Sequence, residues 1–236
     1  MCGRYSITTA LGDLWTRFPL RDENLAYQAR FNIAPVDPVL TVIDEGDRGA
    51  GQQPHGEMLK WGLVPYNAKD AKSGAQLINV RAETAARNYS FRVHMERRRC
   101  LIVADGFYEW RKEGKARYPF RFVLGDGAPF AFAGIWDEWR SSDTDVVLRT
   151  CSILTTEANA LVARVHDRMP VILRPEDEDR WVDASTRDPN DLAKLLAPSP
   201  ASEMDAFAVS TAVNSARNDV PECIAPIRDG ERLQPR

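Results

Sequence analysis

The sequence predicts an α+β fold, a single domain with a strongly bent, mainly antiparallel, barrel-like β core and peripheral helices. Strand-like runs follow one another through residues 39–154, and the short turns between them favour antiparallel neighbours. Helical segments are inserted between and after these runs, without the strict alternation of a βαβ pattern. The 236 residues contain no Ser/Gly-rich linker and no low-complexity stretch, so we expect one domain.

The elements follow from local patterns, beginning with a short capped helix over 8–18. The expected strands are 39–43, 58–63, 100–103, 107–110, 118–123, 130–133 and 146–154. The further expected helices cover about 81–97, 157–165, 175–182 and 189–196. The polar tail 227–236 contains Gly and Pro and is expected to be flexible, which leaves 1–226 as the domain.

Composition argues against two classes of protein. The net charge of −3 does not fit a protein coated in basic charge, and no apolar run approaches the roughly 20 residues that span a bilayer. The start has neither the apolar stretch nor the cleavage pattern of a signal peptide, so we expect a cytoplasmic protein with no membrane partner. Residues 1–121 hold 19 Lys or Arg against 14 Asp or Glu. This excess allows a local basic groove, although the arginine content equally reflects codon composition.

The four cysteines, Cys2, Cys100, Cys151 and Cys223, lie far apart, with no C-x-x-C pair and only three histidines in the chain. This spacing predicts no zinc site. Without an export signal a disulfide framework is equally poorly supported, so each cysteine is expected to be a reduced thiol. We therefore expect no metal and no cofactor.

Cys2 is the most informative residue. Initiator methionine is normally removed before a small residue, and removal of Met1 gives Cys2 a free α-amine beside its thiol. An α-amine has a pKa of about 7.7–8.0 and a thiol about 8.5, so both nucleophiles are partly available at neutral pH. The pair suits aldehydes, with which it closes a thiazolidine ring, and an N-terminal thiol also attacks amide bonds. The alternative is that Cys2 is incidental at a disordered terminus.

Three further segments carry groups suited to proton transfer or anion binding. Asn79 and Arg81 lie two residues apart at the end of a β-like run, and so on one side of a strand. Glu109 stands among aromatic residues, where burial raises a carboxyl pKa toward neutrality. His166 lies at the exit of an expected helix. Each also has a structural interpretation: Asn79 as a helix cap, Glu109 as a surface residue and His166 as a structural histidine.

The chain also carries nine ordered blocks: Met1-Cys2-Gly3-Arg4-Tyr5, Phe31-Asn32-Ile33-Ala34-Pro35, Trp61-Gly62-Leu63-Val64-Pro65, Asn79-Val80-Arg81-Ala82-Glu83-Thr84, Arg99-Cys100-Leu101, Ala104-Asp105-Gly106-Phe107-Tyr108-Glu109-Trp110, Ala133-Gly134-Ile135-Trp136, Thr155-Thr156-Glu157-Ala158-Asn159 and His166-Asp167-Arg168-Met169-Pro170-Val171-Ile172-Leu173. Through these blocks the chain resembles the SOS-response-associated peptidase family, whose members shield abasic sites in single-stranded DNA by crosslinking to them. Two positions depart from the family pattern: Val103 replaces a common proline, and Asn67 stands where a second tryptophan is frequent.

The resemblance implies catalytic roles for four matching residues. Cys2, freed of Met1, is implied as the nucleophile that captures the ring-opened sugar aldehyde. Asn79 is implied as the amide that holds the N-terminal cysteine and the adduct. Glu109 is implied as the acid/base for sugar ring opening and imine formation, and His166 as a second proton-transfer group near the sugar oxygen and the departing phosphate.

The resemblance also implies a DNA-binding surface. Its phosphate clamps are Arg4, Arg81 and Arg168, and its apolar wall, against which bases unstack and stack, is formed by Pro35, Trp61 and Trp110. An abasic nucleotide has no base stacking to lose on extrusion, and single strands are bound by aromatic platforms and arginines. The expected partner is single-stranded DNA with abasic sites, or a single-strand/double-strand junction. We expect it to be bound by a monomer that is nucleoid-associated on damaged DNA.

We therefore expect a sensor and shield of abasic sites that forms a covalent thiazolidine crosslink through Cys2. Autoproteolytic removal of Met1 and AP-lyase activity through the imine are expected side activities. Two alternatives stay open: a thiol peptidase acting on other proteins, and a non-covalent ssDNA-binding module in which Cys2 is incidental. Aldehyde capture ranks first because a 1,2-aminothiol needs little activation toward aldehydes, whereas amide hydrolysis also requires an oxyanion hole.

Overall fold

A computed structural model describes residues 2–21, 25–45, 54–72, 77–227 and 230–235 of the chain. The strands in these ranges are β1 (Tyr5–Ile7), β2 (Arg30–Ile33), β3 (Pro38–Ile43), β4 (His55–Trp61), β5 (Asn79–Arg81), β6 (Arg99–Ala104), β7 (Gly106–Glu113), β8 (Ala116–Leu124), β9 (Phe130–Arg140), β10 (Val147–Glu157), β11 (Arg168–Pro170) and β12 (Met204–Ala208). The α-helices are α1 (Leu11–Arg17), α2 (Ala82–Arg87), α3 (Arg92–Arg97), α4 (Pro175–Val182) and α5 (Pro189–Lys194). The 3-10 helices are η2 (Tyr89–Phe91), η3 (Val162–Arg164), η4 (Ala201–Glu203), η5 (Thr211–Asn214) and η6 (Pro221–Cys223).

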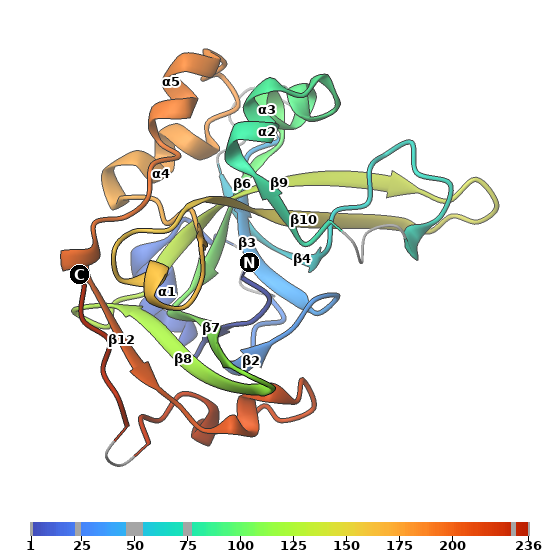
Figure 1. Cartoon of the computed structure of the whole chain (residues 1–236). Helices are drawn as coiled ribbons and strands as arrows, with labels where there is room; N and C mark the ends of the chain where they lie inside the picture. Colours follow the sequence, from blue (N-terminus) through green and yellow to red (C-terminus); the bar gives the residue numbers. More distant parts are fainter. Residues whose placement is uncertain (1, 22–24, 46–53, 73–76, 228–229, 236) are drawn as a thin grey trace.

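Five strands close into a barrel (Figure 1). β10 pairs with β4, β4 with β3, β3 with β6 and β6 with β9, and β9 returns to β10. Of these pairs only β10 with β4 is parallel, while β5 and β11 extend the sheet along the C-terminal part of β10. A second, antiparallel sheet has the order β12-β8-β7-β1-β2. The predicted α+β fold with a mainly antiparallel, barrel-like core is confirmed.

The barrel strands form where the sequence carries long apolar runs. β6 is buried over its whole length and β9 from Phe130 to Asp137, because both lie between other layers of the fold. Continuous apolar runs of this kind are typical of strands covered on both faces. The hairpin between β7 and β8 turns at Gly114, whose φ of 60° is a left-handed conformation that glycine adopts without strain. The predicted strands all overlap observed ones, several of them longer than expected.

The predicted helix over 81–97 is divided in two. α2 ends at Arg87, because the ψ of 123° at the following Asn88 leaves the helical region. The Asn88 side chain accepts a hydrogen bond from the backbone N–H of Ser90. This local hydrogen bond competes with helix continuation, so a 3-10 turn precedes α3. The predictions for 175–182 and 189–196 are confirmed by α4 and α5. Figure 1 shows α2, α3, α4 and α5 gathered on one side of the barrel.

The predicted helix over 157–165 is wrong. Glu157 still belongs to β10 and pairs with Arg168 on β11, and only the three residues of η3 are helical. The side-chain oxygen of Asn159 accepts the backbone N–H groups of Leu161 and Val162. That pattern fixes a turn, and the chain returns at once along β10 as β11.

The described part of the tail contacts the second sheet. The backbone N–H of Leu233 donates to the carbonyl of Ala206 at 2.9 Å, and Arg232 forms a bridge with Phe207 on β12. The domain boundary at residue 226 and the flexibility of 227–236 stay predictions. No helix in the described ranges is long and apolar enough to cross a membrane.

Candidate active site around Cys2

Cys2 lies three residues before β1 and has no exposed surface. β1 itself lies between β2 and β7 in the second sheet. The Cys2 Sγ lies 3.6 Å from the carbonyl oxygen of Arg4. Burial raises the pKa of the Cys2 thiol, and the nearby Glu109 carboxylate raises it further. The thiol is therefore protonated at neutral pH, and its use as a nucleophile requires a base.

Asn79 holds the backbone of Cys2. β5 places Asn79 in parallel register with Ile153 on β10, and its Nδ2 donates to the carbonyl oxygen of Cys2 at 2.7 Å. Its Oδ1 is buried and has no hydrogen-bond partner within the described residues. The helix-cap interpretation is wrong, because the N-cap of α2 is Arg81, and no side chain caps that helix end. Asn79 thus joins β5 to the segment that precedes β1, and its Oδ1 stays available as an acceptor.

Glu109 reaches the same cluster from β7. It is 4% exposed, so the surface interpretation is wrong. Burial raises the pKa of the Glu109 carboxyl, and the neighbouring His166 acts in the opposite direction. Since the pKa of Cys2 responds to Glu109 and that of Glu109 to His166, the three groups share one electrostatic environment. A carboxyl of raised pKa keeps its proton to higher pH than an ordinary glutamate, which suits it to act as a general acid.

His166 completes the cluster from the turn before β11. The backbone N–H of Arg168 donates to its Nδ1 at 3.0 Å, and this geometry assigns the proton of the neutral ring to Nε2. Asp167 Oδ1 lies 2.9 Å from the same Nδ1 and can accept from the protonated ring. The imidazole is 29% exposed, which leaves it a route for proton exchange with solvent.

The predicted phosphate clamps Arg168 and Arg81 differ in how far they are engaged. Arg168 is 8% exposed and donates to both carboxylate oxygens of Glu83, at 2.8 and 2.9 Å. This bidentate pair uses the guanidinium face that a phosphate needs, so Arg168 acts here as a buried structural partner. Arg81 is exposed and lines a hollow of about 410 Å³ together with Asp167 and Arg168. Arg81 is therefore an accessible cation beside the cluster.

Arg4 is half-buried and anchored by two other segments. Its Nη1 donates to Asn32 Oδ1 at 3.0 Å and to the carbonyl of Val213 at 2.9 Å, while burial lowers the pKa of its guanidinium. Asn32, which the sequence analysis did not select, donates from Nδ2 to the carbonyls of Ser215 and Asn218. The signal for Asn32 was a polar residue inside the apolar block Phe31-Asn32-Ile33. These contacts join β2, the N-terminal segment and η5.

The predicted apolar wall is only partly accessible. Trp61 has no exposed surface; its Nε1 donates to the carbonyl of Ile78 at 2.8 Å, and its ring packs edge-on against Tyr5 at 5.3 Å. Trp61 therefore supports β1 and β5 from within and presents no face on which a base can stack. Trp110 and Pro35 are half-buried, with Trp110 Nε1 donating to a side-chain oxygen of η5.

Tyr66, which the sequence analysis also missed, is 65% exposed. Its backbone N–H donates to Asp137 Oδ2 at 2.9 Å, so the loop that carries it is held on β9. Tyr66 lines a hollow of about 760 Å³ together with Tyr89 and Arg98. The signal for Tyr66 was its place directly after the Trp61–Pro65 block. It supplies an exposed ring close to the position where the family pattern has a second tryptophan.

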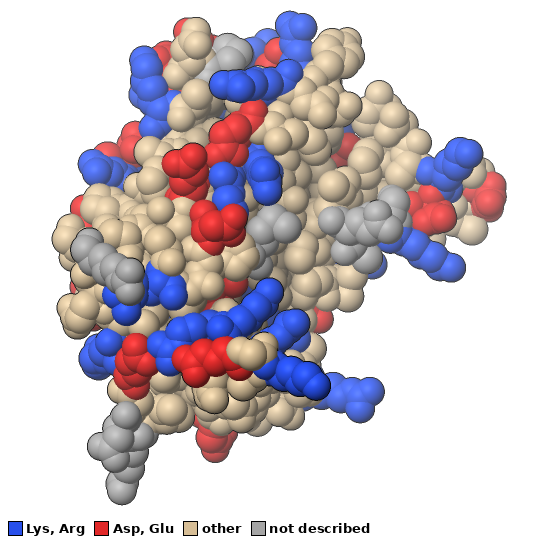
Figure 2. Space-filling model, in the orientation of Figure 1, with Lys and Arg blue, Asp and Glu red and all other residues tan. Residues whose placement is uncertain are grey.

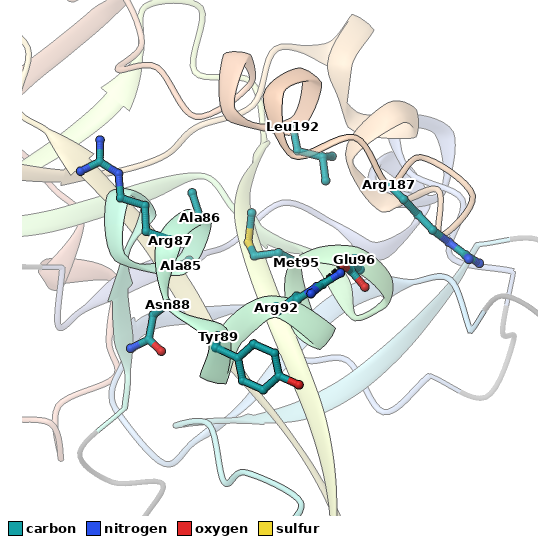
Figure 3. A pocket seen from close by; sticks show the side chains of 10 residues that line it. All are labelled: Ala85, Ala86, Arg87, Asn88, Tyr89, Arg92, Met95, Glu96, Arg187 and Leu192. Atoms are coloured by element: carbon teal, nitrogen blue, oxygen red, sulfur yellow. Dashed lines mark hydrogen bonds and ion pairs between the residues drawn. The ribbon is translucent and has the colours of Figure 1, made fainter.

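A separate hollow of about 350 Å³ lies between α2, α3 and α5 (Figure 3). Met95 and Leu192 approach it from opposite sides, and Arg92 at its edge is paired with Glu96 at 2.7 Å. None of the predicted catalytic or DNA-binding residues is among those that line it. The hollow is therefore distinct from the cluster around Cys2.

Charges of both signs are interspersed over the face shown in Figure 2, with a band of Lys and Arg across its lower part. Several arginines are held in ion pairs, such as Arg149 with Glu57 and Arg111 with Glu231, both at 2.6 Å. Ion-paired arginines contribute little to a basic groove. The surplus of cations in the first half of the sequence therefore does not translate directly into free phosphate-binding groups.

The four cysteines are free and buried. In the described part of the chain, no three His, Cys, Asp or Glu side chains are grouped so that they could hold a metal ion. The chemistry that the cluster offers is thus that of a thiol, an amide, a carboxyl and an imidazole.

The structure thus defines an α+β barrel protein in which the cysteine at residue 2 is buried and its backbone is held by Asn79. The profile of the SOS response associated peptidase (SRAP) family matches residues 1–216, and the chain belongs to this family. The resemblance noted in the sequence is confirmed.

Several relatives match nearly the whole chain. It is 40% identical to the abasic site processing protein YoqW of Bacillus subtilis over 228 residues, covering 95% of this chain and 99% of that protein. It is 29% identical to the abasic site processing protein YedK of Escherichia coli over 239 residues, covering 96% and 100%. Among solved structures, a protein from Bacteroides thetaiotaomicron matches with a TM-score of 0.83 at 24% identity, over 96% of this chain and 100% of that one. That last likeness concerns the fold alone.

Proposed function

We propose that this protein processes abasic sites in DNA, by binding single-stranded DNA or a junction and capturing the open-chain sugar aldehyde on Cys2. The observation that carries the proposal is the cluster in which Asn79 holds the Cys2 carbonyl and Glu109 lies within electrostatic reach of the thiol. The relatives in Bacillus subtilis and Escherichia coli are both named abasic site processing proteins. The nucleic acid is therefore proposed as the substrate, and the sugar as the reacting group.

The proposed reaction needs the α-amine of Cys2, and Met1, which would block it, lies outside the described residues. The amine attacks the sugar C1′ aldehyde carbon to give a carbinolamine, which loses water to form an imine. The Cys2 Sγ then adds to the imine carbon while its proton passes to the imine nitrogen, closing a five-membered thiazolidine. One water leaves overall and nothing is oxidised or reduced.

Proton transfer is the task of Glu109 and His166 in this scheme. Because burial keeps the thiol protonated, the Sγ proton must be taken as the carbon–sulfur bond forms. Glu109, whose pKa is raised by the same burial, protonates the departing carbinolamine hydroxyl and then accepts the thiol proton. His166, partly exposed beside Asp167, assists opening of the sugar ring and exchanges protons with solvent.

DNA binding is assigned to two exposed groups, Arg81 beside the cluster and Tyr66 on the loop that Asp137 of β9 holds. Arg81 contacts the phosphate next to the abasic sugar, and Tyr66 provides a face for a neighbouring base. Trp61 and Arg168 act from within the fold, since one is buried and the other is paired with Glu83. Pro35 and Trp110 remain as the apolar edge of the proposed DNA-binding surface. Arg4 supports this edge through its hydrogen bond to Asn32.

Two side activities follow from the same groups. Attack of Cys2 Sγ on the Met1 carbonyl carbon, with the α-nitrogen as leaving group, gives a thioester that water hydrolyses to release methionine and free the amine. After imine formation, removal of a C2′ proton breaks the C3′–oxygen bond and the 3′ phosphate departs, which is AP-lyase chemistry. Closure of the thiazolidine removes the imine and therefore suppresses this second path.

The test is incubation of the purified protein with a single-stranded oligonucleotide whose one uracil has been excised by a glycosylase. We expect a denaturation-resistant shifted band that Cys2→Ala abolishes and that the matched buried-cysteine variant Cys223→Ala retains. Mass spectrometry of the intact protein checks that Met1 is absent from the reactive form. A wild-type protein that gives no shifted band with Met1 removed overturns the proposal.

The family description favours a second candidate, a thiol peptidase acting on other proteins. Turnover of a peptide library by the wild type in the absence of DNA, lost in Cys2→Ala, supports it. Salt-sensitive binding of single-stranded DNA that is unchanged in Cys2→Ser, with no covalent band, favours the non-covalent binding module.

A further inference from the structure

The position of Cys2 depends on a very short strand. β1 has only three residues, Tyr5–Ile7, and Cys2 stands three residues before Tyr5. β1 pairs with β7 through Tyr5 opposite Phe107 and Ser6 opposite Gly106, and its register with β2 shifts within the same three residues. So few backbone pairs specify register weakly. Additional contacts are therefore needed to fix where Cys2 lies relative to Asn79 and Glu109.

Asp105 supplies these contacts from the residue before β7. Its Oδ2 accepts from the backbone N–H groups of Thr8 and Thr9 and from the Thr8 hydroxyl. Its Oδ1 accepts from the Ser6 hydroxyl at 2.7 Å, and its own backbone N–H donates to the Ser6 carbonyl at 2.9 Å. One buried carboxylate thus holds the strand and the turn that follows it. Hydrogen bonds to a charged acceptor are about twice as strong as neutral ones.

Arg121 on β8 holds the carboxylate in turn. Its Nη2 donates to Asp105 Oδ1 at 2.9 Å and to the Ser6 hydroxyl at 3.1 Å, and both side chains of the ion pair are nearly buried, at 5% and 11% exposure. Gly106 makes room for this pair, because a Cβ at that position would approach Arg121 Nε to 2.6 Å. Asp105 thus binds the Arg121 guanidinium, and Gly106 leaves the space that the guanidinium occupies.

We infer that Asp105, fixed by Arg121, is a positioning residue for Cys2: it sets the register of β1 against β7. β7 also carries Glu109, three residues after Gly106, so the same carboxylate fixes the spacing between the thiol and its acid/base. The inference rests on the proposed function, because it concerns the rate of the reaction assigned to Cys2. It assigns a purpose to the Ala104-Asp105-Gly106 segment that the catalytic roles leave unexplained.

Asp105→Asn is the direct test. Asparagine has the same shape but only one acceptor oxygen, so it cannot serve both the Thr8–Thr9 side and the Ser6–Arg121 side. We expect the single-turnover rate constant of crosslinking to fall at least about tenfold, since small misplacements of reacting groups have large effects on rate. The oligonucleotide concentration that gives half the maximal rate should stay unchanged, because no DNA-contacting group is altered. Arg121→Lys keeps the charge, so its rate constant of crosslinking should lie between those of the wild type and Asp105→Asn.

Glu178→Gln is the matched control for loss of a buried pair. Glu178 on α4 accepts from Arg17 on α1 at 2.7 Å through both oxygens. Its loss should lower Tm and leave the rate constant per folded molecule unchanged. If Asp105→Asn, shown to be folded by its thermal transition, crosslinks at the wild-type rate, the inference is overturned. A wild type that gives no crosslink refutes the proposed function instead, so the two failures are distinguishable.

Discussion

The amide nitrogen of Asn79 lies 2.7 Å from the carbonyl oxygen of Cys2, so a residue on β5 fixes the backbone of the proposed nucleophile. Asn79→Ala removes the amide donor, so the Cys2 carbonyl loses this hydrogen bond. We expect the crosslinking rate to fall by about 10- to 100-fold, because the α-amine and thiol lose their alignment. The measurement is single-turnover band shift on an abasic oligonucleotide under denaturing conditions.

Asn88→Ala is the matched control, since Asn88 also uses its side chain to hold backbone, at Ser90 between α2 and α3. It should keep the wild-type rate. A normal rate in Asn79→Ala contradicts the assigned role, whatever that variant does to stability.

Glu109→Gln tests the buried carboxyl through pH. Because the pKa of Glu109 is raised in the folded state, its contribution to stability is present below the unfolded pKa of about 4.3 and is lost as pH rises through the folded value. Glutamine cannot ionise and avoids this loss. We expect a higher Tm than wild type at pH 8, no difference near pH 4, and a crosslinking rate lower by about 10²-fold.

Glu83→Gln should change the pH dependence of stability in the opposite direction to Glu109→Gln. Pairing with Arg168 lowers the pKa of Glu83 in the folded state. The contribution of Glu83 to stability is therefore present above the pKa of the unfolded state and is lost as pH falls through the pKa of the folded state. The Tm of Glu83→Gln should lie below wild type at pH 8 and converge with it in acid. Parallel behaviour of the two variants across pH would mean that the burial of Glu109 does not have the assigned effect.

Much of the fold could be predicted from sequence, because the barrel strands are long apolar runs. The three-residue strands β1 and β11 could not, since so few residues show no period, whereas β5 coincides with the β-like run expected at Asn79 and Arg81. β1 and β11 form because β7 and β10 offer partners brought close by the rest of the fold. The helix predicted over 157–165 failed for a related reason: the side chain of Asn159 fixes a turn locally, and pairing with β11 favours the strand at Glu157.

The candidate site, too, could be predicted from sequence only in part. Chemistry and motif selected Cys2, Asn79, Glu109 and His166, and the fold brings these residues from four separate segments into one cluster. Accessibility could not be predicted, since Trp61 turned out to be buried and Arg168 to be paired with Glu83. A motif shows that a residue type is needed at a position; whether the side chain faces the substrate or the core depends on packing.

Tyr66 and Trp61 should therefore separate DNA binding from stability. Tyr66→Ala removes an exposed ring and should weaken single-stranded DNA binding by about 1–3 kcal/mol, with a stability change within about 0.5 kcal/mol. Trp61→Phe removes the hydrogen bond to Ile78 and part of a filled core, so it should lower the free energy of unfolding by about 1–3 kcal/mol. Its DNA affinity per folded molecule should be unchanged. Fluorescence anisotropy and denaturant unfolding check the pair, and the reverse pattern contradicts the assignment.

Arg81 and Arg168 should differ in how salt affects binding. A phosphate contact releases a counterion, and for single strands each contact contributes about 0.7 to the slope of log affinity against log salt concentration. Arg81→Ala should reduce that slope by about 0.7, because Arg81 is an exposed guanidinium beside the cluster. Arg168→Lys breaks the bidentate pair with Glu83, so it should lower Tm and leave the slope unchanged. Titrations of an intact, non-abasic oligonucleotide at four salt concentrations measure both slopes without crosslinking. If Arg168→Lys changes the slope and Arg81→Ala does not, Arg168 contacts the phosphate and the assignment to Arg81 is wrong.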